Sequence, residues 1–214
     1  MTTTTPALTP RALAAAGPVI PVIVIDRVAQ ALPLAEALLA GGVRVMEVTL
    51  RTPAGLPAIE AIARALPEVL IGAGTLRSVA DAEAAAGAGA RFGVSPGFAP
   101  ALSDACARLA LPLLPGVSTA TEVMAAQAAG HELLKFFPAE AVGGMPMLKA
   151  LQGPFPDIAF CPTGGVGAAN ASQYLALPNV AMCGGSWLTP ADALRDGDWA
   201  RVTRLAREAA ALRA

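Results

Sequence analysis

The feature that most constrains the fold of this chain is a regular alternation of short apolar runs with alanine-rich segments. The apolar runs recur at intervals of roughly 20 to 26 residues, a rhythm typical of repeated strand–helix units. Such units build a parallel sheet covered by helices, because each helix returns the chain to the start of the next strand. The predicted strands are residues 19–25, 44–50, 69–75, 91–97, 111–117, 132–138, 158–163 and 180–184.

Residues that start helices separate these strands. Two segments have capping-box spacing, in which a hydroxyl side chain and an acidic side chain three residues later satisfy the first N–H groups of a helix: Ser78 with Asp81 and Thr119 with Glu122. Thr189 before Pro190 predicts a cap followed by a first-turn proline. Pro33 lies inside the segment 27–40 and predicts either a late start or a kink in that helix.

Eight strands with eight helices in 214 residues predict an α/β fold of the (β/α)8 TIM barrel type, at the small end of its size range. We expect a single barrel domain over residues 1–214, with an extra N-terminal helix over residues 10–16. A doubly wound open sheet is the alternative. The chain has no GxGxxG fingerprint and no Walker motif, and the barrel is the preferred interpretation.

Composition narrows the class of partner. The chain is 55% hydrophobic and 14% charged, so it is not disordered, and its net charge of -1 leaves no basic patch for nucleic acid. A small-molecule substrate is therefore favoured. The stretch 1–10 lacks a charged leader, and the longest strongly apolar run, residues 19–25, contains Pro21 and is far too short to cross a membrane. These observations predict a cytoplasmic protein with no membrane partner.

Candidate metal ligands are sparse. Cys106, Cys161 and Cys183 are odd in number and far apart, which predicts small buried residues in place of disulfides or zinc ligand pairs. The one histidine, His131, stands at the N-terminal end of its predicted strand, away from the expected site. We therefore expect neither a metal nor a cofactor.

Lys135 is the strongest candidate for covalent chemistry. It lies in the apolar run 131–138, and it is one of two lysines in a chain with 15 basic residues. Burial disfavours the charged ammonium, and a neutral amine is a nucleophile toward carbonyl carbon, so Lys135 is a Schiff-base candidate. The alternative is a lysine whose alkyl stem packs on apolar surface while its head stays in water.

Side-chain alternation places further polar groups beside Lys135. Glu47 and Arg51 share one face of the second strand with Val45 and Thr49, whereas the other face is wholly apolar. Chemistry in this fold collects at the C-terminal ends of the strands, so we expect Glu47 deep in the interior and Arg51 at the rim. The alternative is an interior Glu47–Arg51 salt bridge that only neutralises two charges.

Other strand ends contribute small or polar groups. Thr75 ends the third strand, Pro96 lies at the end of the fourth, Phe137 shares the Lys135 face of the sixth, and Thr163 ends the seventh. Two glycine-rich turns follow the seventh and eighth strands, where barrels often bind phosphate through backbone amides. An isolated glycine pair is usually an ordinary turn, but two at these places predict a phosphate site: Gly164, Gly165, Gly184, Gly185 and Ser186.

The motifs at these strand ends resemble a known family, the 2-keto-3-deoxy-6-phosphogluconate (KDPG) aldolases, which also act as 4-hydroxy-2-oxoglutarate aldolases. The resemblance covers nearly the whole chain and rests on six segments: residues 47–52 (EVTLRT), 72–75 (GAGT), 95–97 (SPG), 135–140 (KFFPAE), 161–165 (CPTGG) and 184–187 (GGSW). Together these motifs are highly specific. They imply a class I aldolase, metal-free and homotrimeric, acting on a keto-acid phosphate.

The resemblance also implies a role for each candidate residue. Lys135 would form the Schiff base, Glu47 would move protons, and Arg51 and Thr75 would hold the pyruvate carboxylate. The five residues of the glycine-rich turns would bind phosphate. Two alternatives need no imine: a phosphosugar isomerase or metal-dependent aldolase, and a non-catalytic sugar-phosphate-binding barrel.

Overall fold

The computed structural model of the protein describes residues 10–212; residues 1–9, most of the Thr- and Pro-rich N-terminal stretch, and residues 213–214 lie outside it. All strands in the described part of the chain run parallel. They are β1 (Val19–Ile23), β2 (Val45–Thr49), β3 (Leu70–Gly74), β4 (Phe92–Val94), β5 (Leu113–Leu114), β6 (Gly116–Val117), β7 (Leu133–Phe136), β8 (Ala159–Pro162) and β9 (Cys183–Gly185).

Helices follow the strands along the chain. They are α1 (Pro10–Ala15), α2 (Ala31–Ala40), α3 (Gly55–Ala65), α4 (Val79–Gly87), α5 (Pro100–Arg108), α6 (Ala120–Ala128), α7 (Gly144–Gln152), α8 (Ala171–Leu175), α9 (Ala191–Asp196) and α10 (Trp199–Ala210), with the 3-10 turns η1 (Val28–Gln30) and η2 (Glu140–Val142). Within the described residues, none of these helices is long and apolar enough to cross a membrane.

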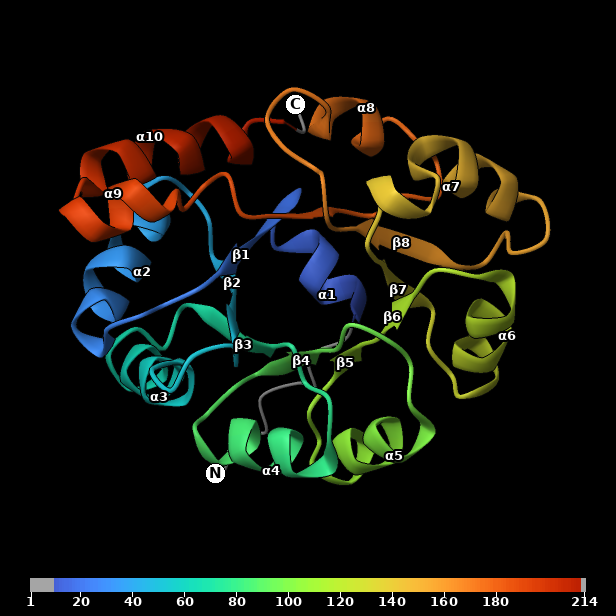
Figure 1. The fold of residues 1–214 in the computed structure, drawn as a ribbon, viewed down its shortest axis with the longest axis horizontal. Helices are drawn as coiled ribbons and strands as arrows, with labels where there is room; N and C mark the ends of the chain where they lie inside the picture. The colour runs from blue at the N-terminus through green and yellow to red at the C-terminus, as the bar shows by residue number, and fades with distance from the viewer. Residues whose placement is uncertain (1–9, 213–214) are drawn as a thin grey trace, which may run out of the picture.

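The fold is an α/β arrangement with a curled parallel sheet. The strands pair in the orders β5-β4-β3-β2-β1-β9 and β6-β7-β8, and isolated bridges join Phe160 to Val180 and Thr163 to Gly184. In Figure 1 the strands curve around a common centre, with α2 to α10 outside them. The order of strands along the sheet follows their order in the sequence, as the strand–helix rhythm predicts.

The predicted strand 111–117 is the one that the structure divides. Its first part, β5, pairs with β4, and its second part, β6, pairs with β7. Pro115 stands between them, and it has no N–H to donate to a ladder. Its carbonyl instead accepts a hydrogen bond from the Lys135 N–H at 2.8 Å. The prediction of a single unbroken strand was wrong at this residue.

Side-chain alternation separates an inner core from an outer one. Val45 packs in an inner cluster with Phe92 and Leu133, whereas Met46 and Val48 belong to the cluster beneath the outer helices. Glu47 has the parity of Val45 and therefore faces inward, as predicted. The inner cluster also contains Leu13 of α1, the helix that crosses the centre of the strand ring in Figure 1.

Two predicted helix starts are capping boxes and one is not. The Ser78 and Thr119 side chains accept hydrogen bonds from the N–H of Asp81 and Glu122, whose carboxylates reach back to the caps. Burial alone would raise the pKa of Glu122, but hydrogen bonds from residues 118 and 119 outweigh it and hold that pKa below its ordinary value. Thr189 does not cap α9: Pro190 is its N-cap, and the Thr189 hydroxyl donates to the Ser186 carbonyl at 3.4 Å.

Pro33 marks a late helix start. The 3-10 turn η1 precedes α2, which begins at Ala31, so Pro33 falls in the first helical turn. An N–H at that position has no acceptor within the helix, and proline is tolerated there. Of the two alternatives for the segment 27–40, the late start is confirmed.

The interior has no room for a side chain at Gly72 of β3. A Cβ added to Gly72 would lie 2.5 Å from Cε1 of Phe92, which is fully buried. Overpacking of this kind typically costs about 1 to 3 kcal/mol. We expect Gly72→Ala to lower the free energy of unfolding in urea by that amount. Gly87→Ala is the control, because a Cβ on that helical residue meets no atom within 4 Å and should leave stability unchanged or slightly raised. Equal midpoints for both variants would contradict the tight packing of β3.

His131 lies between α5 and the start of β7, away from the carboxyl ends of the strands. Its Nε2 lies 2.8 Å from the Ser103 hydroxyl, its ring meets Phe98 edge-on, and burial lowers its pKa from the ordinary 6.5.

The lowered pKa of His131 makes the stability of the protein depend on pH. In the unfolded chain the imidazole gains a proton as the pH falls through 6.5, whereas in the folded protein it takes up that proton only at a lower pH, so protonation favours unfolding. We therefore expect part of the loss of stability below pH 6.5 to vanish in His131→Gln. Parallel stability curves for the two proteins between pH 8 and pH 5 would contradict this expectation.

Candidate active site

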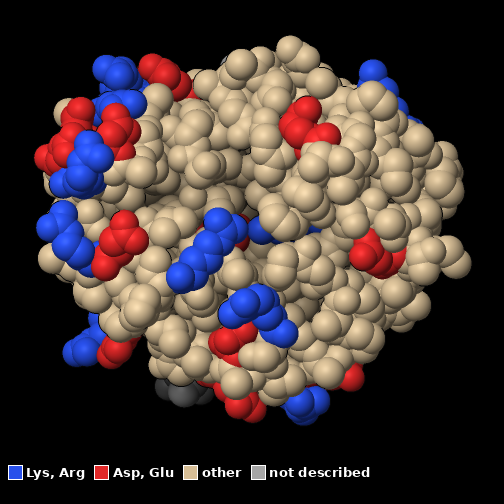
Figure 2. Space-filling model, in the orientation of Figure 1, with Lys and Arg blue, Asp and Glu red and all other residues tan. Residues whose placement is uncertain are grey.

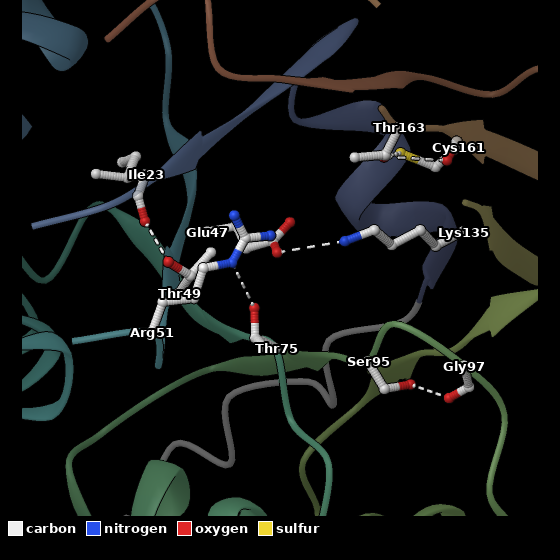
Figure 3. A network of polar contacts seen from close by, with 10 residues as sticks. All are labelled: Ile23, Glu47, Thr49, Arg51, Thr75, Ser95, Gly97, Lys135, Cys161 and Thr163. Carbon is white, nitrogen blue, oxygen red and sulfur yellow. Dashed lines mark hydrogen bonds and ion pairs between the residues drawn. The ribbon is translucent and has the colours of Figure 1, made fainter. Parts of the chain in front are cut away.

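The structure places the Lys135 amine inside the curled sheet, opposite Glu47. Lys135 is 4% exposed and Glu47 is 3% exposed, and Lys135 Nζ lies 3.5 Å from Glu47 Oε1. β7 and β2 carry these residues from opposite sides of the interior, and Figure 3 shows the two side chains reaching toward each other across it. The alternative of a lysine with its head in water is therefore wrong.

The Glu47 carboxylate has unused hydrogen-bonding capacity. Its Oε1 accepts no hydrogen bond from any residue of the described chain and has only the lysine ion pair. A buried charged pair is a poor stabiliser of a fold, since desolvation of both ions offsets their attraction. Such a buried pair with a free acceptor suits proton transfer better than structural support.

Arg51 and Thr75 meet at the rim above this pair. Arg51 Nε donates to the Thr75 hydroxyl at 3.4 Å, and Glu47 forms its ion pair with Lys135 and not with Arg51. The predicted alternative of a neutralising Glu47–Arg51 bridge is therefore wrong. Thr75 has a φ of 65°, an unfavourable conformation for a β-branched residue. Strain of this kind concentrates at functional sites.

Small residues make room for the carboxylate. A Cβ on Gly74 would lie 2.7 Å from Glu47 Cδ, so no larger residue fits beside Glu47 without displacing it. The residues of the segment 72–75 therefore serve two purposes: their small size admits the carboxylate, and Thr75 carries a hydroxyl to the rim. Thr49, on the same face as Glu47, is fully buried and donates to the Ile23 carbonyl at 2.9 Å.

Phe137 follows β7 and Pro96 follows β4, two strands separated by the β5–β6 segment. The Phe137 ring centroid is 5.1 Å from Lys135 Nζ, close enough for a cation–π contact with the ammonium. Pro96 follows β4, and its carbonyl approaches Gly116 so closely that a Cβ there would collide with it. Ser95 closes the same turn by donating to the Gly97 carbonyl at 2.8 Å.

Cys161 on β8 and Thr163 just after that strand lie beside Lys135 of β7. Lys135 and Cys161 are register partners, and the Thr163 hydroxyl donates to the Cys161 carbonyl at 3.3 Å. Burial raises the pKa of the Cys161 thiol to about 12, although the Lys135 charge opposes that rise. The thiol therefore remains protonated near neutral pH. Cys106 and Cys183 are also buried, as expected for the three cysteines.

The two glycine-rich turns lie next to each other. The Thr163–Gly184 bridge joins the end of β8 to β9, so residues 164 and 165 are adjacent to residues 184 to 186. Gly164 and Gly165 have φ values of 96° and 80°, which strongly favour glycine. Ser186 also lines a cavity of about 650 Å³ between the β1–α2 and β9–α9 loops. The structure thus brings together all the predicted phosphate-site residues.

Three residues beneath the first turn did not figure among the predicted site residues: Glu140, Asn170 and Tyr174. The Tyr174 hydroxyl donates to Glu140 Oε1, and Asn170 Nδ2 donates to the Gly165 carbonyl at 3.1 Å. Glu140 ends the KFFPAE motif, and Tyr174 is the only tyrosine of the chain, but neither fact reveals their contact from the sequence.

The site opens on one face of the molecule. Figure 2 shows a hollow near the centre of that face, with basic side chains at its edge and both basic and acidic atoms in its depth, whereas much of the surrounding surface is uncharged. Such a hollow attracts anionic ligands. Within residues 10–212 no group of three or more His, Cys, Asp or Glu side chains is arranged to hold a metal ion.

Comparison with known proteins identifies relatives over most of the chain. The family model described as KDPG and KHG aldolase matches residues 11–205. The 2-dehydro-3-deoxy-phosphogluconate aldolase of Pseudoalteromonas atlantica is 52% identical over 91% of each chain. The KHG/KDPG aldolase of Escherichia coli K12 is 51% identical over 90% of this chain and 91% of its own.

A solved structure agrees with this assignment. The KDPG aldolase from Legionella pneumophila, with pyruvate held as a covalent carbinolamine intermediate, is 48% identical and superposes with a TM-score of 0.92. The match covers 94% of this chain and 98% of that one. The buried lysine, the glycine-rich turns and these similarities lead to one conclusion: the chain belongs to the KDPG and KHG aldolase family.

Proposed function

We propose that the protein is a class I aldolase that cleaves 2-dehydro-3-deoxy-6-phosphogluconate into pyruvate and glyceraldehyde 3-phosphate. The observation that carries the proposal is the buried Lys135–Glu47 pair, 3.5 Å apart and carried by the opposing strands β7 and β2. A relative that holds pyruvate as a covalent carbinolamine supports the same chemistry, since a carbinolamine is what an amine forms with a ketone.

The first half of the reaction uses Lys135 as a nucleophile. Glu47 takes a proton from the Lys135 ammonium, and the neutral amine adds to the C2 ketone. Return of that proton to the carbinolamine hydroxyl expels water and leaves a protonated imine. The imine withdraws electrons from C3, so the C3–C4 bond breaks when Glu47, directly or through a water, removes the proton of the C4 hydroxyl. Glyceraldehyde 3-phosphate leaves, and an enamine of pyruvate remains on Lys135.

The second half returns the enzyme to its starting state. Glu47 now carries the proton and lies beside Lys135, so it can deliver a proton toward the enamine C3. Hydrolysis of the imine then releases pyruvate and the free amine. The unused acceptor capacity of Glu47 Oε1 fits this role, because the oxygen must be free to take up a proton.

Binding groups follow from the arrangement around the pair. Arg51 and Thr75 would hold the pyruvate carboxylate at the rim, while Pro96 and Phe137 would line the apolar side of the pocket. The phosphate would be bound by residues of the adjacent turns: Gly164, Gly165, Gly184, Gly185 and Ser186. Guanidinium and backbone N–H groups are strong donors to carboxylates and phosphates, which supports this division.

The chain is also proposed to form one (β/α)8 barrel domain with α1 as an extra N-terminal helix. The bridges from Phe160 to Val180 and from Thr163 to Gly184 support closure between β8 and β9, and the β5–β6 segment joins the two sheets. Homotrimeric assembly and cytoplasmic residence stay predictions. Cleavage of 4-hydroxy-2-oxoglutarate to pyruvate and glyoxylate is proposed as a second activity, because one relative is named a KHG/KDPG aldolase.

Reduction of the proposed imine tests the mechanism. Incubation with pyruvate and sodium borohydride should attach a reduced pyruvyl group to Lys135, located by peptide mass mapping, because the imine is trapped as a stable amine. Lys149 is the internal control, since it is exposed on α7 and should stay unmodified. Lys135→Met should abolish the adduct and lower kcat by more than about a thousandfold. Absence of any adduct in the wild-type protein would instead favour an isomerase or a sugar-phosphate-binding protein.

Thr163 is proposed to recognise the configuration at C4. It lies beside Lys135 on the neighbouring strand and next to the glycine-rich turns. Thr163→Val keeps the shape and removes the hydroxyl, so the ratio of kcat/KM values for KDPG and its C4 epimer should fall by about fivefold to tenfold. Thr163→Ser, which keeps the hydroxyl, is the control. An unchanged ratio in the valine variant would count against this role.

A further inference from the structure

The Gly164–Gly165 turn rests on a connected network of three side chains, Glu140, Asn170 and Tyr174, here called the turn network. The three come from different places in the fold: η2, the residue before α8, and α8 itself. None of them has a role in the mechanism proposed above. Their contacts reach the turn from beneath, on the side of its carbonyl groups.

The first contact joins Glu140 to Tyr174. The Tyr174 side chain is fully buried, and its hydroxyl donates to Glu140 Oε1. Burial, with the neighbouring carboxylate second, raises the pKa of the phenol, so the hydroxyl stays a donor at any pH at which the enzyme works. Gly144 leaves space for this contact, because a Cβ there would lie 3.0 Å from the hydroxyl oxygen.

The second set of contacts fixes the turn itself. Asn170 Nδ2 donates to the Gly165 carbonyl at 3.1 Å and lies 3.5 Å from Glu140 Oε1. The Glu140 N–H donates to the Gly164 carbonyl at 3.1 Å. A Cβ on Gly165 would collide with the Glu140 side chain, so the turn packs directly on it. The carbonyls of Gly164 and Gly165 therefore both point toward Glu140 and Asn170, which donate hydrogen bonds to them.

Peptide geometry then sets the direction of the amides. In a planar trans peptide the N–H points opposite to the C=O, so the N–H groups of Gly165 and Val166 point away from the network. In the described part of the chain neither N–H donates a hydrogen bond to another residue. Two free backbone donors on successive peptides, with both carbonyls hydrogen-bonded elsewhere, form an arrangement ready to receive an anion.

We propose that the turn network is a positioning device for the substrate phosphate. The Asn170 amide and the Glu140 main-chain N–H hold the carbonyls of the turn, and Tyr174 fixes the Glu140 side chain on which the turn packs, so that the amides are oriented before the substrate arrives. The inference rests on the proposed function, because it concerns the phosphate of that substrate. None of the three side chains touches the substrate. They act through the turn, and an aligned turn binds more tightly because less ordering accompanies binding.

The test separates binding of phosphate from chemistry at Lys135. Cleavage of KDPG needs the phosphate site, whereas exchange of the pyruvate methyl protons with deuterium oxide needs only the imine and enamine. We expect Tyr174→Phe and Asn170→Ala to raise the KM for KDPG by about fivefold to tenfold. The kcat for cleavage and the pyruvate exchange rate should stay within about twofold of wild type.

Two matched variants complete the design. Glu140→Gln keeps an oxygen acceptor for the Tyr174 hydroxyl and should behave as wild type, whereas Glu140→Ala should behave as Tyr174→Phe. Asn179→Ala removes another buried amide, whose Nδ2 donates to the Leu148 carbonyl at 2.8 Å. Asn179 lies beside Phe160 near the start of β8, whereas the turn follows the end of that strand. Its KM for KDPG should not change, even where its stability does.

Each outcome decides between defined possibilities. An unchanged KM in Tyr174→Phe and Asn170→Ala, or equal losses in cleavage and pyruvate exchange, would overturn the positioning role while leaving the aldolase proposal intact. If the wild-type protein neither exchanges pyruvate protons nor forms the borohydride adduct, the proposed function itself fails and the phosphate role fails with it. A rise in the KM for KDPG alone supports the turn network.

Discussion

The rest of the site depends on one electrostatic constraint: a lysine and a glutamate are held in contact inside a low-dielectric interior. Lys135 and Glu47 are each less than 5% exposed, and they come from strands that are far apart in the sequence. The fold must supply both the closeness and the desolvation, because neither follows from local sequence. A curled parallel sheet does so by turning the inward faces of opposing strands toward each other.

Space around this pair is as important as charge. Gly74 and Gly72 leave β3 without side chains where the Glu47 carboxylate and the Phe92 ring require room. Thr75 then continues the same strand in a strained backbone conformation and carries a hydroxyl to Arg51. One short segment thus admits the buried acid and shapes the rim, which explains why residues 72–75 are all small.

Much of the fold could be predicted because it follows from periodic patterns. The strand–helix rhythm locates the strands, and alternation along β2 correctly assigns Glu47 to the inner face and Met46 to the outer one. The predicted site residues are brought together because the carboxyl ends of parallel strands lie at one end of the sheet. Their placement thus follows from topology, whereas their roles follow from the family resemblance.

What the sequence could not predict depends on three-dimensional contact. The predicted strand 111–117 divides at Pro115, and its two halves pair with strands of different sheets. The Thr189 hydroxyl donates to a carbonyl where a helix cap was expected. The support beneath the Gly164–Gly165 turn joins Glu140 to Tyr174, which is 34 residues away. No periodic signal marks such a contact, since a hydrogen bond between two elements far apart in the sequence leaves no spacing rule in the chain.

Cys161 of β8, the register partner of Lys135, affects which reagents can label the site. The Lys135 amine and the Cys161 thiol are both of nucleophilic type and stand on register-paired residues. Because the thiol has a pKa of about 12, it is a poor thiolate source at neutral pH, so soft alkylating reagents gain little from entering this pocket. Carbonyl-bearing reagents suit the amine instead, and inhibitors for this enzyme are better built on oxo acids than on thiol-directed groups.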